Sequence, residues 1–557
     1  MRPKSGRLNG LLWRLTAMRR LWAPGAQPSM PFLANESVPS APVGHIEPMP
    51  SKIGRGSMGV RGWVLFPAEA TDRVEISLGG KPLGRARLGV ARVDVGEEWE
   101  SPLAAISGFE LNADLSDWDG PDGPTTVAAE AISLSGERHR LEPVPVTVSG
   151  EPPAKAKLPP PAPVEIDPST PRPRVLVFTH QLGLGGAQLY LLDLLREISR
   201  TGSAGFVVVS ALDGPVRKDL EAMGIPVHVT SPIPSDDLGS HLGRIEELAG
   251  WAEGREFDAV FINTATTLAS PGAEVADRLD LPVVWAIHES FPPSFLFDHM
   301  IPEVRERHDR ALQRSSFLVF EAEATKRIFE PIAGSAACVM LPYGLDLEPI
   351  DAARKEFDRA AARREHGIPE DARAIVCIGT VEPRKAQALL AQAFDQIAAR
   401  RPDAHLYFVG GRKDHDSEAL RRYIASSPNR DRIELIPLTP DVQPWYGMAD
   451  ILVSASDVES LPRTVLEAMA WETPVLATDV FGLPELITDG ETGWLCEARD
   501  LEALAGGLDH ALDANPEERA AIARAARSLV EERHSLERYG SEIAKLLSSS
   551  AKHVETP

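Results

Sequence analysis

Residues 456–470 read SDVESLPRTVLEAMA, and this stretch carries two glutamates, Glu459 and Glu467, with seven residues between them. The apolar run before it predicts a buried strand, while Ser460 is typical of a helix N-cap and Pro462 of a first helical turn. A helix N-terminus offers unpaired N–H groups and a positive dipole end to a phosphate. Carboxylates beside an anion are costly unless they accept hydrogen bonds from hydroxyl groups. The stretch therefore predicts a strand–turn–helix site for a sugar nucleotide, although a capped surface helix with two solvated acids shares the pattern.

The spacing of Glu459 and Glu467, with AMAWETPVLAT at 468–478, resembles the donor-site signature of retaining GT-B glycosyltransferases of family 4, or group 1. The resemblance extends over roughly residues 174–548. In that family the first Glu lies beside the transferred sugar and the second holds the ribose hydroxyls. The resemblance thus implies a catalytic role for Glu459 and donor binding for Glu467.

A second loop, IGTVEPRKAQ at 378–387, follows a predicted strand and opens a helix. Two cations there can neutralise a diphosphate leaving group, whose developing charge is the main obstacle to glycosyl transfer. Family members often have Arg directly after the Gly and Lys-Gly at the helix start, where this chain has Thr380 and Ala386. The resemblance implies that Lys385 is a catalytic phosphate ligand, whereas Arg384 either binds the donor or faces solvent.

The resemblance also implies how transfer proceeds. Front-face attack, in which the departing phosphate oxygen removes the acceptor proton, needs no pair of carboxyl groups at a glycosidase spacing. Pro462 has no N–H group where many relatives carry Gly, so Ser460 and Leu461 are the expected backbone donors to the phosphate. No metal site is apparent in the sequence, and no metal or other cofactor is expected.

The first half of the chain contributes two further candidates. GLGGAQ at 183–188 follows an apolar strand, and glycines such as Gly185 and Gly186 let backbone N–H groups approach a donor. The segment is no dinucleotide fingerprint, because glycine would be needed where Gln188 stands. It resembles the Gly-Gly-Ala-Glu element of the family with Gln188 in place of the acid, and a tight turn without a ligand is the alternative.

His288 directly follows the apolar run 283–287, at the edge of the expected cleft. A lone histidine is usually a structural hydrogen-bonding group, but the family places a histidine here near the transferred sugar and the acceptor. Glu289 either orients His288 or is solvated. The segment LPYGLD at 341–346 resembles the Pro-Asn-Gly-x-Asp crossing between the family's two domains, with Tyr343 replacing Asn.

Apolar strands alternate with helical segments beyond residue 174, which predicts an α/β fold. Two doubly wound, Rossmann-like domains, 174–350 for the acceptor and 351–548 for the donor, are expected to face each other across a cleft, as in GT-B enzymes. The predicted strands are 175–178, 206–209, 259–262, 283–287 and 317–320 in one sheet, and 374–378, 405–409, 433–436, 451–453 and 475–477 in the other.

Three segments precede these domains. Residues 1–57 begin with six bases and no acid among the first 22, which predicts a basic amphipathic helix, and continue as an unstructured stretch. Residues 58–150 show period-two alternation between turn signals, which predicts a small Ig-like β-sandwich. Its three tryptophans form either its core or a sugar-stacking face. Residues 151–173 are rich in proline and predict an extended linker.

Composition limits the partners. The 557 residues carry a net charge of -23, which argues against nucleic-acid binding, and the three cysteines lie in or beside apolar runs typical of a reduced core. No apolar run reaches the length of a membrane span. A cytoplasmic protein is expected, with residues 1–25 either in peripheral contact with an anionic membrane or forming a disordered tail, if they are translated at all.

The sequence thus predicts a retaining transferase that moves a sugar from a nucleoside-diphosphate sugar to a glycan, a lipid-linked acceptor or another acceptor of the cell envelope. Two alternatives share the architecture. One is a sugar-nucleotide epimerase, which would need no acceptor. The other is a glycan-binding scaffold without turnover, suggested by Thr380, Gln188 and the added β-module.

Overall fold

The computed structural model describes most of the chain: residues 39, 41–150 and 172–552, apart from 56, 68, 100–102, 116–117, 267–268 and 298–299. The predicted basic helix near the start lies outside the described residues, as does nearly all of the predicted proline-rich linker. No helix in the described ranges is long and apolar enough to cross a membrane.

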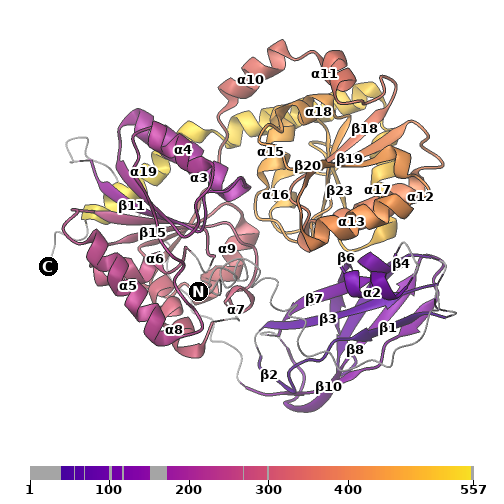
Figure 1. Ribbon diagram of the computed structural model, residues 1–557, viewed down its shortest axis with the longest axis horizontal. Helices are drawn as coiled ribbons and strands as arrows, with labels where there is room; N and C mark the ends of the chain where they lie inside the picture. The colour runs from indigo at the N-terminus through magenta and orange to yellow at the C-terminus, as the bar shows by residue number, and fades with distance from the viewer. Residues whose placement is uncertain are drawn as a thin grey trace, which may run out of the picture.

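The first described unit, the β-module, is made of two facing sheets (Figure 1). Alternate residues of its strands are buried, as the period-two pattern predicts. One sheet has the order β1 (Val43–Ile46), β3 (Ser57–Leu65), β7 (Gly108–Asp114) and β6 (Arg87–Val90). The other has β2 (Lys52–Ile53), β10 (Val144–Val148), β8 (Gly123–Ser133), β4 (Thr71–Leu78) and β5 (Lys81–Arg85), with β9 (Arg138–Arg140) also paired to β8.

The structure corrects one prediction for this unit and decides between two alternatives for its tryptophans. Strands β1 and β2 lie in the stretch predicted to be unstructured, because β1 gains its order from antiparallel pairing with β3, where Val43 is opposite Leu65. Trp63 and Trp99 are buried in a cluster with Leu65, so neither belongs to a sugar-stacking face. Helix α2 (Val93–Glu98) and the 3-10 turn η2 (Ala104–Ile106) complete the module.

The first α/β domain holds a parallel sheet of seven strands, and the five strands predicted for it are confirmed. Its central strands are buried almost throughout, as a sheet covered by helices on both faces requires. The order is β13 (Val227–Val229), β12 (Gly205–Ser210), β11 (Arg174–Thr179), β14 (Ala259–Asn263), β15 (Val283–Ile287), β16 (Phe317–Phe320) and β17 (Ala337–Met340). Its helices are α3 (Gly186–Thr201), α4 (Val216–Ala222), α5 (Leu238–Ala252), α6 (Gly272–Arg278), α7 (Pro293–Leu296), α8 (Pro302–Gln313) and α9 (Glu323–Phe329).

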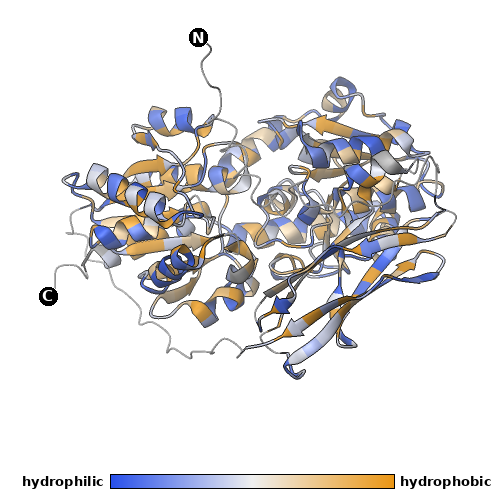
Figure 2. Cartoon of the chain, turned by 60° about the horizontal axis from the view of Figure 1, so that its bottom comes forward, coloured by the Kyte–Doolittle hydropathy of each residue, from blue (hydrophilic) through white to orange (hydrophobic). Residues whose placement is uncertain are grey.

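The second α/β domain repeats this plan with six parallel strands, and its five predicted strands are also confirmed. Figure 2 shows mostly hydrophobic strands inside both α/β domains and helices of mixed hydropathy around them. The order is β20 (Ile433–Pro437), β19 (Ala404–Gly411), β18 (Arg373–Ile378), β21 (Ile451–Ser454), β22 (Val475–Thr478) and β23 (Trp494–Cys496). Its helices are α10 (Leu347–Glu356), α11 (Arg359–Glu365), α12 (Gln387–Ile397), α13 (His415–Ser426), α14 (Gln443–Met448), α15 (Arg463–Ala470), α16 (Leu483–Leu486), α17 (Leu501–Asp513) and α18 (Pro516–Arg533).

The last helix, α19 (Leu536–Lys552), does not belong to the second domain. It crosses back and packs on α3 of the first domain, where the hydroxyl groups of Tyr190 and Tyr539 are hydrogen-bonded (Figure 1). The predicted boundary of the donor domain at residue 548 is therefore wrong for this helix, because its apolar face is buried against the first domain.

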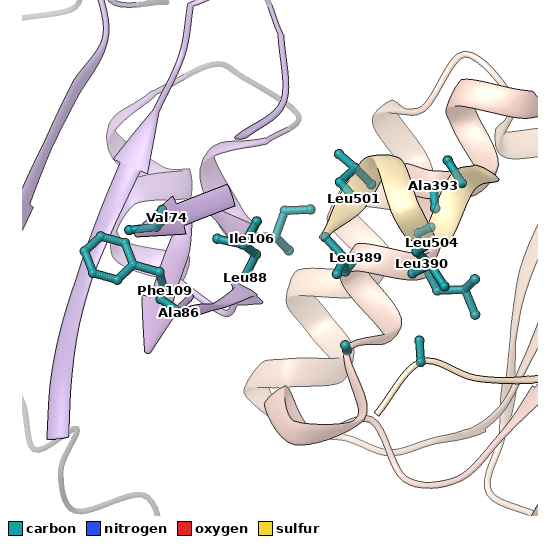
Figure 3. Close-up of a cluster of buried hydrophobic side chains, with 14 of the residues drawn as sticks. Val74, Ala86, Leu88, Ile106, Phe109, Leu389, Leu390, Ala393, Leu501 and Leu504 are labelled. Atoms are coloured by element: carbon teal, nitrogen blue, oxygen red, sulfur yellow. The ribbon is translucent and has the colours of Figure 1, made fainter. Parts of the chain in front are cut away.

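The β-module and the second α/β domain share one hydrophobic core (Figure 3). Leu88 and Ile106 of the module face Leu389 of α12 and Leu501 of α17 across the boundary. Gly89 has a φ of +72° and brings the module backbone so close that a side chain there would lie 3.1 Å from the Cβ atom of Ala388. The module is therefore fixed to this domain by close apolar packing.

Replacing Leu88 with Ala tests this shared core. We expect the free energy of unfolding to fall by about 3 kcal/mol, since a buried Leu→Ala change loses burial and leaves a cavity. Hydrogen exchange should accelerate in both β6 and α12. The control is Leu134→Ala at an exposed position of the module, which should change neither quantity measurably. Faster exchange confined to the module would contradict a shared core.

Candidate active site

The predicted site residues lie in loops that leave the carboxyl ends of the two parallel sheets. Strand order reverses between β11 and β14 in the first sheet and between β18 and β21 in the second. Loops diverge from a sheet at such points and leave a crevice for a ligand. The loops after β18 and β21 carry the cations and the first carboxylate of the signature, so the fold brings these two sequence motifs together.

Lys385 reaches the site across a glycine. Gly379 has a φ of +147°, and a Cβ atom there would lie 3.1 Å from Cδ of Lys385. Only glycine can adopt this positive φ and leave room for the lysine side chain without strain. Lys385 ends the 3-10 turn η4 (Pro383–Lys385), and Ala386 follows in the left-handed conformation with a φ of 49°. The Gly expected there from the resemblance is thus replaced by an alanine that keeps the backbone shape of a glycine.

Glu459 lies at the centre of a cluster of charges. Glu459 is 9% exposed, and its carboxylate accepts hydrogen bonds from Nζ of Lys385 at 2.7 Å, Nη1 of Arg384 at 3.1 Å and Oγ of Ser456 at 3.0 Å. Burial opposes ionisation, but the charges of Lys385 and Arg384 outweigh it and lower the pKa of Glu459 to about 2. The site therefore holds an ionised carboxylate directly between two cations.

Arg384 is held by two acids and does not project freely into solvent. Its Nε atom donates to Glu382 at 2.9 Å, and that carboxylate also accepts the hydroxyl of Thr380 at 2.6 Å. The charges of Glu459 and Glu382 outweigh the effect of burial and raise the pKa of Arg384. Thr380, which replaces the family's Arg, thus helps to hold the acid that orients Arg384.

Ser460 has a different role from the predicted helix cap. Helix α15 begins at Arg463 after Pro462, and the hydroxyl of Ser460 makes no capping bond to it. Instead it lies 2.8 Å from Oγ1 of Thr325, which in turn lies 2.6 Å from Oγ of Ser290. This chain of three hydroxyl groups crosses from one domain to the other. It joins the residue after Glu459 to the loop that carries His288, so the two predicted catalytic loops meet between the two domains.

Leu461 and Glu467 are both buried, but in different surroundings. Leu461 belongs to the hydrophobic core. Glu467, 4% exposed, accepts hydrogen bonds from the hydroxyl of Tyr446 at 2.6 Å and from Nε of Arg463 at 2.6 Å. Arg463 also donates to Asp193 of the first domain at 2.6 Å. The second acid of the signature therefore belongs to a network that joins the two domains, and part of its acceptor capacity is already used.

His288 is held on both sides by acceptors. Nδ1 lies 2.8 Å from Oε1 of Glu321, and Nε2 lies 3.0 Å from Oδ1 of Asn263. The Asn263 amide is oriented by its Nδ2 group, which donates to the carbonyl of Ala187 at 3.0 Å. Both ring nitrogens therefore donate, and the ring is an imidazolium. Burial opposes that charge, but the carboxylate of Glu321 outweighs it and raises the pKa of His288.

Glu289 does not orient His288, contrary to one of the predicted alternatives. Its carboxylate accepts the backbone N–H groups of Ala265 at 2.7 Å and of His288 at 3.2 Å. Burial raises the pKa of Glu289. Glu321, at the end of the neighbouring strand β16, takes the orienting role because parallel strands bring their carboxyl ends to the same edge.

The glycine turn before α3 is shaped by its own side chains. Gly185 is the extended N-cap residue, and a Cβ atom there would lie 2.5 Å from Oε1 of Gln188. Gly186 begins the helix with open space around it. The amide of Gln188 lies 2.8 Å from Nε2 of His180 and donates to it, since burial and the nearby charge of His288 lower the pKa of His180 to about 4. Gln188 therefore suits a neutral histidine at this place.

Sequence reasoning missed three residues that organise the site. Arg463 precedes Glu467 by four residues, the spacing at which charges pair on a helix, so a signal was present. Glu321 follows a predicted strand in the same way as His288 does, which was a second signal. Asp193 lies in the middle of an amphipathic helix, and nothing in the sequence around it indicated a role in the site. Within the described ranges, no group of three His, Cys, Asp or Glu side chains is arranged to hold a metal ion.

Two protein-family models match the chain. The family described as "Glycosyl transferases group 1" matches residues 358–529, and the one described as "Glycosyl transferase 4-like domain" matches residues 185–344. Between them, the matched segments include every site residue that the sequence predicted. The β-module lies outside both.

Similar proteins agree with these matches. The GDP-mannose-dependent monoacylated alpha-(1-6)-phosphatidylinositol monomannoside mannosyltransferase of Corynebacterium glutamicum is 27% identical over 390 residues, 66% of this chain and 96% of that protein. The lipopolysaccharide core biosynthesis mannosyltransferase LpsB of Rhizobium meliloti is 30% identical over 249 residues, 42% of this chain and 70% of that protein. The crystal structure of Anabaena HepE in complex with UDP and glucose has a TM-score of 0.58 and 21% identity, and the match covers 68% of this chain and 100% of that one.

The structural likeness at this identity shows the fold, and the relatives and family matches show the class of protein. The chain therefore belongs to the group 1 glycosyltransferases of the GT-B fold and is a glycosyltransferase.

Proposed function

We propose that this glycosyltransferase moves a sugar from a nucleoside-diphosphate sugar to a hydroxyl group of a glycan, a lipid-linked acceptor or another envelope acceptor, with retention of anomeric configuration. The observation that carries the proposal is the ionised Glu459 carboxylate between Lys385 and Arg384. A sugar hydroxyl is a suitable donor to such a carboxylate, and a diphosphate is a suitable partner for the two cations. The similar mannosyltransferases, named for a phosphatidylinositol mannoside and for lipopolysaccharide core, support the choice of acceptor.

The cations would act on the leaving group. As the bond between the anomeric carbon and the phosphate oxygen breaks, negative charge develops on the diphosphate, and Lys385 and Arg384 are already oriented toward it. The acceptor oxygen forms its new bond on the same face, and its proton passes to the departing phosphate oxygen. Fixed charges in a water-poor site stabilise such a transition state without reorganisation. We propose that no metal is needed, because the two side chains supply the positive charge.

The remaining groups would hold the rest of the donor. The carboxylate of Glu467 has about four lone-pair positions, and two of them accept hydrogen bonds from Tyr446 and Arg463. The hydroxyl groups of a ribose can donate to the others. The backbone N–H groups of Ser460 and Leu461 precede Pro462 and are the donors this loop offers to a phosphate. Those of Gly185 and Gly186 open α3 on the opposite side of the cleft.

His288 would donate a hydrogen bond from Nε2 to the transferred sugar or the acceptor in exchange for the one it makes to Asn263, because both of its N–H groups are otherwise used. An imidazolium has no free lone pair, so it cannot take the acceptor proton. This assignment agrees with front-face transfer, in which the leaving phosphate accepts that proton.

Calorimetry with the UDP, GDP, ADP and dTDP sugars tests the function, in buffer that contains EDTA. We expect the protein to bind at least one of them and to release the nucleotide slowly in the absence of an acceptor.

Lys385→Ala should lower turnover on the order of 100-fold, as expected for losing one donor to a developing charge. Lys545→Ala, at an exposed ion pair on α19, is the control. No binding to any of the donors would overturn the proposal, and loss of activity in EDTA that returns with magnesium would overturn its metal-free form.

The pH profile tests the role of His288. Because its pKa is raised above the usual 6.5, the charged form is kept to a higher pH than in a free histidine and is lost as pH rises through the raised value. We expect kcat/KM to fall along that alkaline limb. In His288→Gln the limb should disappear and kcat/KM should be about 10- to 100-fold lower, since hydrogen bonds to charged groups contribute about 1.5–3 kcal/mol. A rise in kcat/KM over the same pH range would instead identify His288 as a general base.

A further inference from the structure

The donor loop is held from behind by the β-module. Asp457 precedes Glu459 by two residues, and its side chain is 0% exposed. Its carboxylate forms a close ion pair, Oδ2 to Nε at 2.5 Å, with Arg87 of β6 in the module. Arg499 of the second domain is a more distant partner, with its Nε atom 3.8 Å from Oδ1. A residue outside both matched family segments therefore supplies the main countercharge to a residue of the donor loop.

Arg87 is fixed on the module by its strand neighbours. In the sheet β3–β7–β6, Arg61 and Arg87 lie opposite Glu110 from its two sides. The carboxylate of Glu110 accepts hydrogen bonds from Arg61 at 3.0 and 2.9 Å and from Nη1 of Arg87 at 3.4 Å. Cross-strand neighbours in register hold each other's side chains in place. Arg87 thus projects from a rigid sheet toward the donor loop.

Asp457 also joins the two site loops. Its backbone N–H group donates to the carbonyl of Arg384 at 2.8 Å, and the adjacent Ser456 donates to Glu459 at 3.0 Å. The loop with the cations and the loop with the carboxylate therefore meet at Asp457. Removing the partner of a buried charge is strongly destabilising, so the carboxylate of Asp457 would have to move or gain a proton without Arg87. Either change would shift the loop that carries Glu459.

We propose that Arg87 is a positioning residue for glycosyl transfer, through which the β-module holds the donor loop in its reactive geometry. The module is thus part of the donor site, and its attachment beneath the second α/β domain in Figure 1 is a requirement of catalysis. The inference rests on the proposed transfer from a nucleotide sugar. Small displacements of catalytic groups are expensive, because a misplacement of about 1 Å can cost about 100-fold in rate.

Arg85 provides a matched control. It lies two residues before Arg87 and also connects the module to the second domain, with Nη1 at 2.6 Å from Glu497 and 2.7 Å from Asp500. It makes no ion pair with the donor loop. A general weakening of module attachment should therefore appear in Arg85→Ala, whereas a specific effect on the loop should appear only at Arg87.

The experiment uses the full chain and compares Arg87→Met, Arg87→Lys, Arg87→Met/Asp457→Asn and Arg85→Ala with the wild type. Hydrogen exchange in residues 456–461 is measured first, because it needs no knowledge of the donor. We expect exchange there to accelerate about 10-fold or more in Arg87→Met and to remain within twofold of the wild type in Arg85→Ala. Equal exchange in these two variants would overturn the proposal.

Turnover and thermal stability then separate positioning from folding. The double variant removes both charges, so we expect its Tm to recover toward that of the wild type while kcat stays at least about 10-fold low and the donor KM changes less. Arg87→Lys, which keeps the charge, should recover part of kcat. If kcat follows Tm across the set, Arg87 is merely structural and the proposal fails. Failure of the wild type to turn over any sugar nucleotide would overturn the proposed function, whereas the exchange result would still decide whether Arg87 braces the loop.

Discussion

The organisation of the donor side depends on one interaction: a buried carboxylate, Glu459, held ionised between Lys385 and Arg384. An isolated carboxylate would be costly in this position, and two cations that close together would repel each other. The carboxylate reduces the repulsion between the two cations, and the cations offset the cost of burying the carboxylate. The positive φ of Gly379 and the left-handed turn at Ala386 then follow as the backbone shape that brings the lysine to the acid.

The same arrangement explains how the site is prepared for a diphosphate. The carboxylates of Glu459 and Glu382 form ion pairs with Arg384 and Lys385 and hold these two side chains in place. A bound diphosphate can take over part of these contacts, and Glu459 is then free to accept a sugar hydroxyl. Across the cleft, the hydroxyl chain through Thr325 and the ion pair between Arg463 and Asp193 join the two domains. The contacts between the two domains therefore lie beside the residues that we propose bind the donor.

The sequence was most informative where a signal is local. Apolar runs predicted ten strands of the two parallel sheets, and the family resemblance of two motifs implied that Lys385 and Glu459 share a site. The sequence was least informative where a contact joins segments that are far apart in the chain. Three features depend on tertiary packing, which the periodicity of a sequence cannot show. They are the contact of His288 with Glu321 instead of Glu289, the return of α19 to the first domain and the pairing of Arg87 with Asp457. The start of the β-module was missed for the same reason, since β1 is ordered by its partner strand.

The central claim is that this site transfers a sugar on the front face of the donor, with the leaving phosphate as base and without a protein nucleophile. Proton NMR of the first product formed from an anomerically pure nucleotide sugar tests it most directly, because the coupling of the anomeric proton reports configuration before any mutarotation. The account predicts that the product has the configuration of the donor. A product of the opposite configuration would contradict it and would require a base on the far side of the sugar ring.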